Sequence, residues 1–458
     1  MPPKKSGRDC TTGSIPRHLL AVATPMLIGN FIQSGYTIVD AIWVGRVVGK
    51  DAIGAIAVSF PIIFIFIAVA AGATMATTIL ISQYFGAGKI EEVKKTIGAS
   101  LFFALLTSIV ISVAGILAAE PILRLLKTPP SILAQASLYL KINFSGFLVM
   151  YFSYLVGSIL RGIGDSKTPL YFMIVGAVVN AVLDPLLIIG VGPFPRLGLG
   201  GAAVASICAQ LIATIVGYRY LRNKGNIVAV DLRLIRWNPE KISLLVKIGF
   251  PSMLQQSMVS LGLATITGIV NSFGATATAA FGAAGRIDTV SMFPAMSIGM
   301  AVSIICGQNI GAGEYGRVRQ VFRWGMMMTA ASSLFFMIFY LTIPKLLLSA
   351  FLSDQVVLDI GANFLRIVGP GELFFAIAFV SNGVINGAGH TRVTLLFTTI
   401  ALWGVRVPAI LLLSKTALGV NGIWLGTVIG YFTSMLLSLI WYFSGRWTRK
   451  VLRTSKPG

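Results

Sequence analysis

The sequence is poor in charged residues, cysteine and histidine. Only 11% of its 458 residues are Asp, Glu, Lys or Arg, whereas a soluble protein carries about a quarter. A chain with so little charge cannot cover a water-facing surface, so we expect lipid to cover most of it. The three Cys and two His are far apart, which argues against a disulfide framework, a metal framework and a nucleophile–base set. We therefore predict neither enzymatic activity nor a cofactor.

Long apolar runs take the place of the missing charge. Hydrophobic residues make up 56% of the chain, and the mean hydropathy is +0.85. A transmembrane helix needs about 20 apolar residues. The runs are continuous and do not alternate, which excludes a membrane barrel. We predict an all-α polytopic membrane protein with twelve transmembrane helices at residues 16–44, 54–82, 94–118, 134–160, 168–190, 199–221, 244–272, 279–307, 319–343, 358–386, 392–414 and 420–444.

The net charge is +21, and the positively charged residues lie at the ends of these apolar runs. That pattern is typical of membrane topology and not of nucleic-acid binding. With a cytoplasmic N-terminus, 25 Lys and Arg fall in segments predicted inside, 7 outside and 4 within spans. This bias predicts a multi-pass protein of the cytoplasmic (inner) membrane with both termini in the cytoplasm.

The two halves of the chain repeat at an offset near 225 residues. QYFGAG at 83–88 matches QNIGAG at 308–313, and LRGIGDSK at 160–167 matches INGAGHTR at 385–392. Since each half holds an even number of helices, the halves share one orientation, with a pseudo-twofold axis along the membrane normal. We predict two pseudo-symmetric six-helix bundles: an N-lobe over 1–221, a cytoplasmic linker over 222–243 and a C-lobe over 244–458.

These motifs carry a family resemblance. The first helix with Pro25 and Asp40, the QxxGAG loop, the LRGxGDxKTP segment and NAVLDP at 180–185 together resemble the multidrug and toxin extrusion (MATE) family. The resemblance runs over nearly the whole chain. It implies a monomeric rocker-switch exporter in which a proton or sodium gradient drives the efflux of amphipathic organic cations or other drugs. A flippase for lipids or lipid-linked glycans, as in the wider superfamily, is the alternative.

Acidic residues within the N-terminal spans are candidates for the ion-coupling site, because a charge in mid-bilayer costs at least about 2.5 kcal/mol. Asp40 and Asp184 are the only ones, and their positions along their helices place both in the outer half of the membrane. Close carboxylates either share a proton or hold a cation between them. Tyr36 and Asn180 lie one turn before them, and Ser206 aligns with a hydroxyl that the resemblance places at the family's N-lobe cation site. With sodium as the coupling ion, Asp40, Asn180 and Asp184 would ligate it; a buried polar network that only joins helices is the alternative.

Other residues have less specific roles. Pro25 and Pro185 allow helix kinks. A second set of charged residues lies within the C-terminal spans: Arg286, Asp288, Arg366, Glu372 and Arg406. Since the set mixes both signs, we interpret it as an ion-pair network in which the charges neutralise one another. The seventh span has Gln255 and Gln256 but no acid, which favours the DinF-like over the NorM-like branch. Candidates for lining a promiscuous cavity are Gln33, Gln255, Met258 and Met292, since flexible methionine suits such surfaces.

Overall fold

The computed structural model describes residues 7–222, 235–351 and 353–449. Within these residues, twelve helices are long and apolar enough to cross a membrane, as predicted. Several are longer than the predicted spans: the second runs over Asp51–Gly86 and the third over Ile90–Leu125, whereas the sixth, Leu199–Leu221, matches its prediction. The longer helices continue past the apolar runs of the sequence because each backbone amide remains hydrogen-bonded within the helix.

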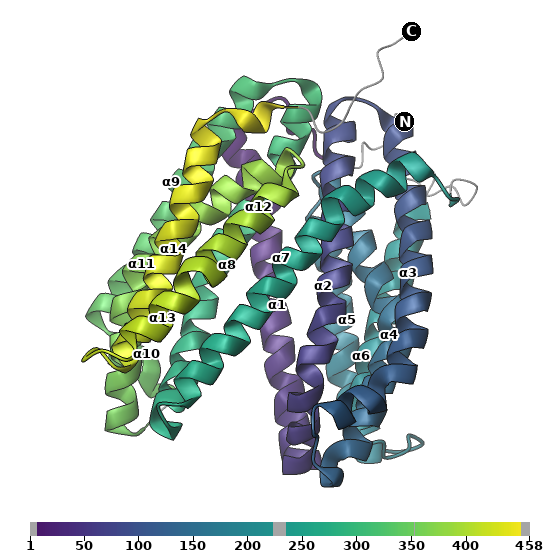
Figure 1. Ribbon diagram of the computed structural model, residues 1–458. Coiled ribbons are helices and arrows are strands. Elements are labelled where there is room, and N and C mark those ends of the chain that lie inside the picture. The colour runs from purple at the N-terminus through teal and green to yellow at the C-terminus, as the bar shows by residue number, and fades with distance from the viewer. Residues whose placement is uncertain (1–6, 223–234, 352, 450–458) are drawn as a thin grey trace. The chain divides into compact units, whose positions relative to one another are not determined.

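The first half contains six long helices (Figure 1). In order they are α1 (Ile15–Trp43), α2 (Lys50–Gly86), α3 (Ile90–Leu125), α4 (Pro130–Gly162), α5 (Lys167–Pro185) and α6 (Leu199–Arg222). Two π-helical turns, η1 (Val44–Val48) and η2 (Leu186–Gly190), extend α1 and α5. Helix α4 packs between α3 and α6, and α6 also packs against α5.

The second half repeats this order with more breaks. It comprises α7 (Pro239–Asn271), α8 (Ala275–Ala312), α9 (Tyr315–Thr342), α10 (Pro344–Ser349), α11 (Gln355–Gly387), α12 (Thr391–Thr398), η4 (Thr399–Arg406), α13 (Val407–Leu413), α14 (Val420–Phe443) and η5 (Arg446–Thr448). The predicted span 392–414 is the continuous path α12–η4–α13, with π geometry in its middle. Helix α11 packs against α8, α9 and α14.

The chain forms two compact units. The first contains Ile28–Phe85 and Lys89–Met253, and the second contains Asp9–Leu27, Gly86–Gly88 and the chain from Leu254 onward. Helix α1 therefore begins in the second unit, whereas the predicted N-lobe includes all of it. Most of the predicted linker, residues 223–234, lies outside the described residues. The boundaries at 221 and 244 stay a prediction.

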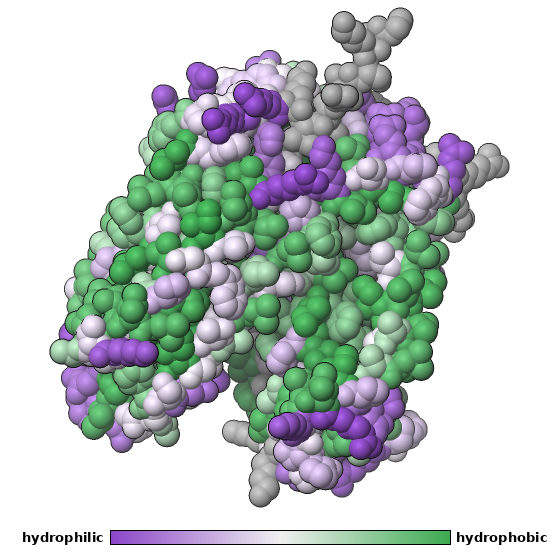
Figure 2. Space-filling view, in the orientation of Figure 1, coloured by the Kyte–Doolittle hydropathy of each residue, from purple (hydrophilic) through white to green (hydrophobic). Residues whose placement is uncertain are grey.

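Apolar side chains are abundant on the surface of the helices. In Figure 2, hydrophobic residues cover the sides of the visible helices, and hydrophilic residues gather near the helix ends. Leu117 on α3 and Phe443 on α14 are 73% and 74% exposed. In water such exposure would be a liability, but a lipid environment accommodates it.

Candidate functional site: two buried acidic clusters

Five predicted residues meet in the first unit, where we call them the N-terminal site: Tyr36, Asp40, Asn180, Asp184 and Ser206. The Tyr36 hydroxyl lies 2.6 Å from the Ser206 hydroxyl. The Asn180 side-chain amide donates to Asp184 Oδ1 (3.2 Å) and to Ser206 Oγ (3.3 Å). Asp40 is close enough to Asp184 to interact with it electrostatically. The site thus joins α1, α5 and α6.

Three oxygen atoms of the N-terminal site lack a hydrogen-bond donor. They are Asp40 Oδ1, Asn180 Oδ1 and Asp184 Oδ2, all buried. The side chains of Asn180 and Asp184 are 1% and 0% exposed. Buried polar atoms normally have a hydrogen-bond partner, and each one that lacks a partner lowers the stability of the fold by about 1–3 kcal/mol. An acceptor-only cluster of this kind is chemically suited to a proton or to a small hard cation.

The local backbone is irregular next to both carboxylates. The π turn η1 begins four residues after Asp40, and η2 begins two residues after Asp184. Pro185 cannot donate a hydrogen bond to the carbonyl one turn earlier, which loosens the helix at this point. Isolated π turns occur frequently at functional sites. Pro25 lies inside α1, ten residues after the helix begins at Ile15.

A second buried acidic cluster lies in the second unit, and we call it the C-terminal cluster: Asp288, Ser291, Tyr340, Glu372 and Arg406. The Ser291 hydroxyl donates to the Glu372 carboxylate. Asp288 is close enough to Glu372 to interact with it electrostatically, and its Oδ1 is buried without a hydrogen-bond partner. The Tyr340 hydroxyl donates to the Ile287 carbonyl (3.1 Å) and interacts electrostatically with Glu372. The cluster thus contains a buried acid pair, Asp288 and Glu372.

Arg406 supplies the positive charge of the C-terminal cluster. It interacts electrostatically with Asp288, donates to Thr427 Oγ1 (3.2 Å) and lies 5.0 Å from the centre of the Tyr431 ring. Its guanidinium Nε is buried without a partner. The other two predicted arginines, Arg286 and Arg366, are exposed and contribute to none of the salt bridges found among the described residues.

The predicted cavity residues lie in both units. Gln255 donates to Thr398 (2.9 Å), and the backbone carbonyl of Met258 accepts from Trp403 (3.2 Å), so this part of α7 contacts the α12–η4 segment. Gln33 is exposed in the first unit, and Met292 is half-buried on α8.

The chain matches a known family in both halves. The MatE family model matches residues 25–186 and again residues 251–412. This chain belongs to the MATE family of multidrug transporters. The two matches start 226 residues apart, which agrees with the repeat in the sequence.

Similar proteins cover the whole MATE chain. It is 34% identical over 451 residues to the probable multidrug resistance protein YpnP of Bacillus subtilis (strain 168), covering 98% of this chain and 99% of the relative. It is 33% identical to YoeA of the same strain, covering 95% of both chains. A solved structure of a MOP superfamily transporter from Pyrococcus furiosus is similar with a TM-score of 0.88 at 23% identity, covering 96% of this chain and 98% of that one. These likenesses confirm the predicted fold and membership of a transporter family.

The sequence did not indicate two members of the C-terminal cluster of this MATE transporter, Ser291 and Tyr340. Ser291 and Tyr340 carry no intramembrane charge, so nothing in the sequence distinguishes them from many other Ser and Tyr residues. The sequence does indicate that Arg286 lies outside this cluster. Arg286 is two residues before Asp288, and residues two apart on a helix do not share a face. Among the described residues, no group of three or more His, Cys, Asp or Glu could hold a metal ion. The N-terminal site has two carboxylates, Asp40 and Asp184, and otherwise neutral oxygens.

Proposed function

We propose that this MATE transporter exports amphipathic organic cations in exchange for protons or sodium ions, and that the coupling ion binds at the N-terminal site. The observation that carries the proposal is the trio of buried, unpartnered oxygens on Asp40, Asn180 and Asp184. A bound proton or cation would give these oxygens a partner. Its release would leave them unpartnered again, and the two carboxylates would repel each other. An ion shifts a conformational equilibrium only if it binds one conformation more tightly than the other.

The coupling ion is the transported substrate of this site and not a resident cofactor. A sodium ion would take its ligands from Asp40, Asn180 and Asp184, with Ser206 Oγ as a further neutral oxygen. A proton would reside on one of the two carboxyl groups. In both cases the positive charge offsets the repulsion between the carboxylates.

Helix α1 would transmit the ion's effect to the substrate. Asp40 and Tyr36 lie on the same helix as Pro25, and the Tyr36–Ser206 hydrogen bond ties that helix to α6. We propose that ion binding changes these hydrogen bonds and bends α1 at Pro25, with Pro185 adjusting α5, so that substrate leaves the N-lobe. Coupling through the N-terminal half is the arrangement of the DinF-like branch. The rest of the proposal is a monomer in the cytoplasmic membrane, surrounded by lipid, with both termini in the cytoplasm.

The flippase alternative requires a large basic cavity formed by Arg286, Arg366 and Arg406. Arg406 lies beside Asp288 and the acid pair, which offsets its charge. We therefore favour the exporter.

Efflux of ethidium from proteoliposomes under an imposed proton or sodium gradient tests the proposal. We expect gradient-dependent efflux, its loss in Asp40→Asn, and full activity in the matched control Asp51→Asn, whose carboxylate is exposed at the start of α2. Full coupled efflux by Asp40→Asn would refute the coupling site. Absence of gradient dependence with any organic cation, together with movement of a labelled lipid between leaflets, would favour the flippase.

A further inference from the structure

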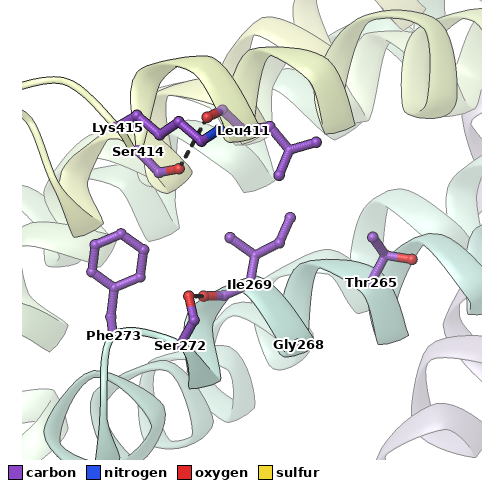
Figure 3. Close-up of a pocket in the computed structure, with 8 residues that line it drawn as sticks. All are labelled: Thr265, Gly268, Ile269, Ser272, Phe273, Leu411, Ser414 and Lys415. Carbon is purple, nitrogen blue, oxygen red and sulfur yellow. Dashed lines mark hydrogen bonds between the residues drawn. The ribbon is translucent and has the colours of Figure 1, made fainter.

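A groove lies between two helix ends of the second unit. It has a volume of about 450 Å³ and is lined by Thr265, Gly268, Ile269, Ser272, Phe273, Leu411, Ser414 and Lys415. One wall is the end of α7 and the turn after it, and the other is the end of α13 and the residues that follow (Figure 3). Ile269 and Phe273 point across the groove toward the opposite wall. From Thr265 to Phe273 the groove extends about 12 Å along the helix axis.

The groove changes in polarity along its length. Three of its polar residues, Ser272, Ser414 and Lys415, follow the last residues of α7 and α13, where the predicted spans 244–272 and 392–414 reach the outer membrane surface. The fourth, Thr265, lies inside α7, and its hydroxyl donates to the backbone of its own helix. Gly268 and Leu411 lie further into the helices, toward the apolar interior. Beside the groove, Leu263 and Leu412 are 56% and 70% exposed, as expected of side chains that contact acyl chains. The groove therefore crosses the boundary between the headgroup layer and the hydrocarbon layer.

Lys415 is the only charged residue of the groove. Its side chain is exposed and forms none of the salt bridges found in the described part of the chain. The hydroxyl of Ser272 donates to the Ile269 carbonyl (2.7 Å), and that of Thr265 donates to the Leu261 carbonyl (2.9 Å). Ser414 likewise donates to the Leu411 carbonyl (3.4 Å). Because these hydroxyl protons are already used, the Lys415 ammonium is the side-chain donor available to an anion.

Gly268 keeps the middle of the groove open. A Cβ atom built on it would meet no atom within 4 Å. A Cβ atom at this position would therefore project into open space on the wall of the groove.

We propose that this groove binds one anionic phospholipid, with the phosphate at Lys415 and the start of an acyl chain along Gly268, Ile269 and Leu411. A lysine near a membrane surface favours anionic lipid by enough to change affinity about fivefold. Since Lys415 acts as a single point charge, the headgroup's net charge determines the preference. The apolar wall contributes equally for any lipid with the same chains.

Lipid titration followed by native mass spectrometry of the full-length detergent-solubilised protein tests the site. The probes are dioleoylphosphatidylglycerol and dioleoylphosphatidylcholine, which differ in headgroup and share their chains. We expect the native protein to bind the first about fivefold more tightly. Lys415→Gln should remove this preference and keep the affinity for phosphatidylcholine, and Lys415→Arg should retain the preference. Gly268→Leu should weaken binding of both lipids.

Matched controls separate the groove from general effects. Lys127→Gln removes an exposed lysine that is also predicted outside, and Gly282→Leu fills open space on α8; both should bind like the native protein. An unchanged preference in Lys415→Gln would overturn the proposal. So would competition by inorganic phosphate that abolishes lipid binding, because the groove would then take a free anion. If Gly268→Leu fails to fold, the Lys415→Gln and Lys415→Arg pair still decides the matter.

Discussion

The hydroxyl groups of Tyr36 and Ser206 lie 2.6 Å apart and join α1 to α6 next to Asp40. Ser206 also accepts from Asn180, which in turn donates to Asp184. The chain of contacts connects the α1 carboxylate region to the α5 carboxylate through neutral groups. A change of charge on Asp40 or Asp184 should therefore alter hydrogen bonds that join α1, α5 and α6.

We expect Tyr36→Phe to slow gradient-driven efflux about fivefold, since it removes one hydrogen bond worth about 1 kcal/mol. Ser206→Ala should slow efflux at least as much, because it also removes the bond from Asn180. Because both substitutions break the same bond, the double variant should be no slower than the slower single one. Ethidium efflux from proteoliposomes with matched protein content measures this. Additive losses would show that the two hydroxyls act independently.

Asp184→Asn should stabilise the protein while removing coupled efflux. Its carboxylate is fully buried, with one oxygen unpartnered near the unpartnered oxygens of Asp40 and Asn180. An amide at this position offers donors to a cluster that has only free acceptors. We expect the melting temperature in detergent to rise by about 2–4 °C, which corresponds to about 1 kcal/mol for a large chain. Asp51→Asn, which alters an exposed carboxylate, should leave it unchanged; an equal rise there would contradict the explanation.

Much of this arrangement follows from the sequence because its causes are local. Apolar runs predict the twelve helices, and the position of each acid along its helix predicts that Asp40 and Asp184 share a depth. The N-terminal site could therefore be assembled by counting residues. Its hydrogen-bond pattern could not, because Tyr36 and Ser206 are 170 residues apart and their contact depends on helix rotation.

The C-terminal cluster shows the limit more clearly. Five intramembrane charges predicted one network, but helix rotation places Arg286 and Arg366 on exposed faces. The neutral residues Ser291 and Tyr340 take their places around Glu372. Which residues face inward depends on how α8, α9 and α11 pack together, and a single charged position does not reveal that packing.

Arg406 should stabilise the acid pair of Asp288 and Glu372. Arg406→Met keeps much of the apolar side-chain body but removes the charge, and we expect a loss of about 3 kcal/mol, seen as a lower melting temperature. Adding Glu372→Gln should restore part of the loss, because the amide can still accept from Ser291 and donate to Asp288. A double-mutant cycle measures the coupling. A double variant as unstable as the sum of the two single variants would argue against a shared network.

Lys241 lies at the start of α7 in the first unit. Its side chain is 2% exposed, and its Nζ lies 2.6 Å from Glu92 Oε2 and 2.8 Å from the Tyr84 hydroxyl. Glu92 has a second lysine partner, Lys95, at 2.9 Å with a side chain 45% exposed. The same carboxylate thus forms one buried and one exposed ion pair.

Removing the two lysines in turn should have very different effects. Exposed pairs contribute about 0–1 kcal/mol, whereas breaking a buried pair costs more because one partner stays desolvated. We expect Lys241→Gln to cost about 2 kcal/mol and Lys95→Gln less than about 0.5 kcal/mol, measured by thermal unfolding in the same detergent. Lys241→Gln should also loosen the first turns of α7, which hydrogen exchange of residues 241–248 would report. Equal effects of the two substitutions would show that burial of Lys241 does not strengthen its pair with Glu92.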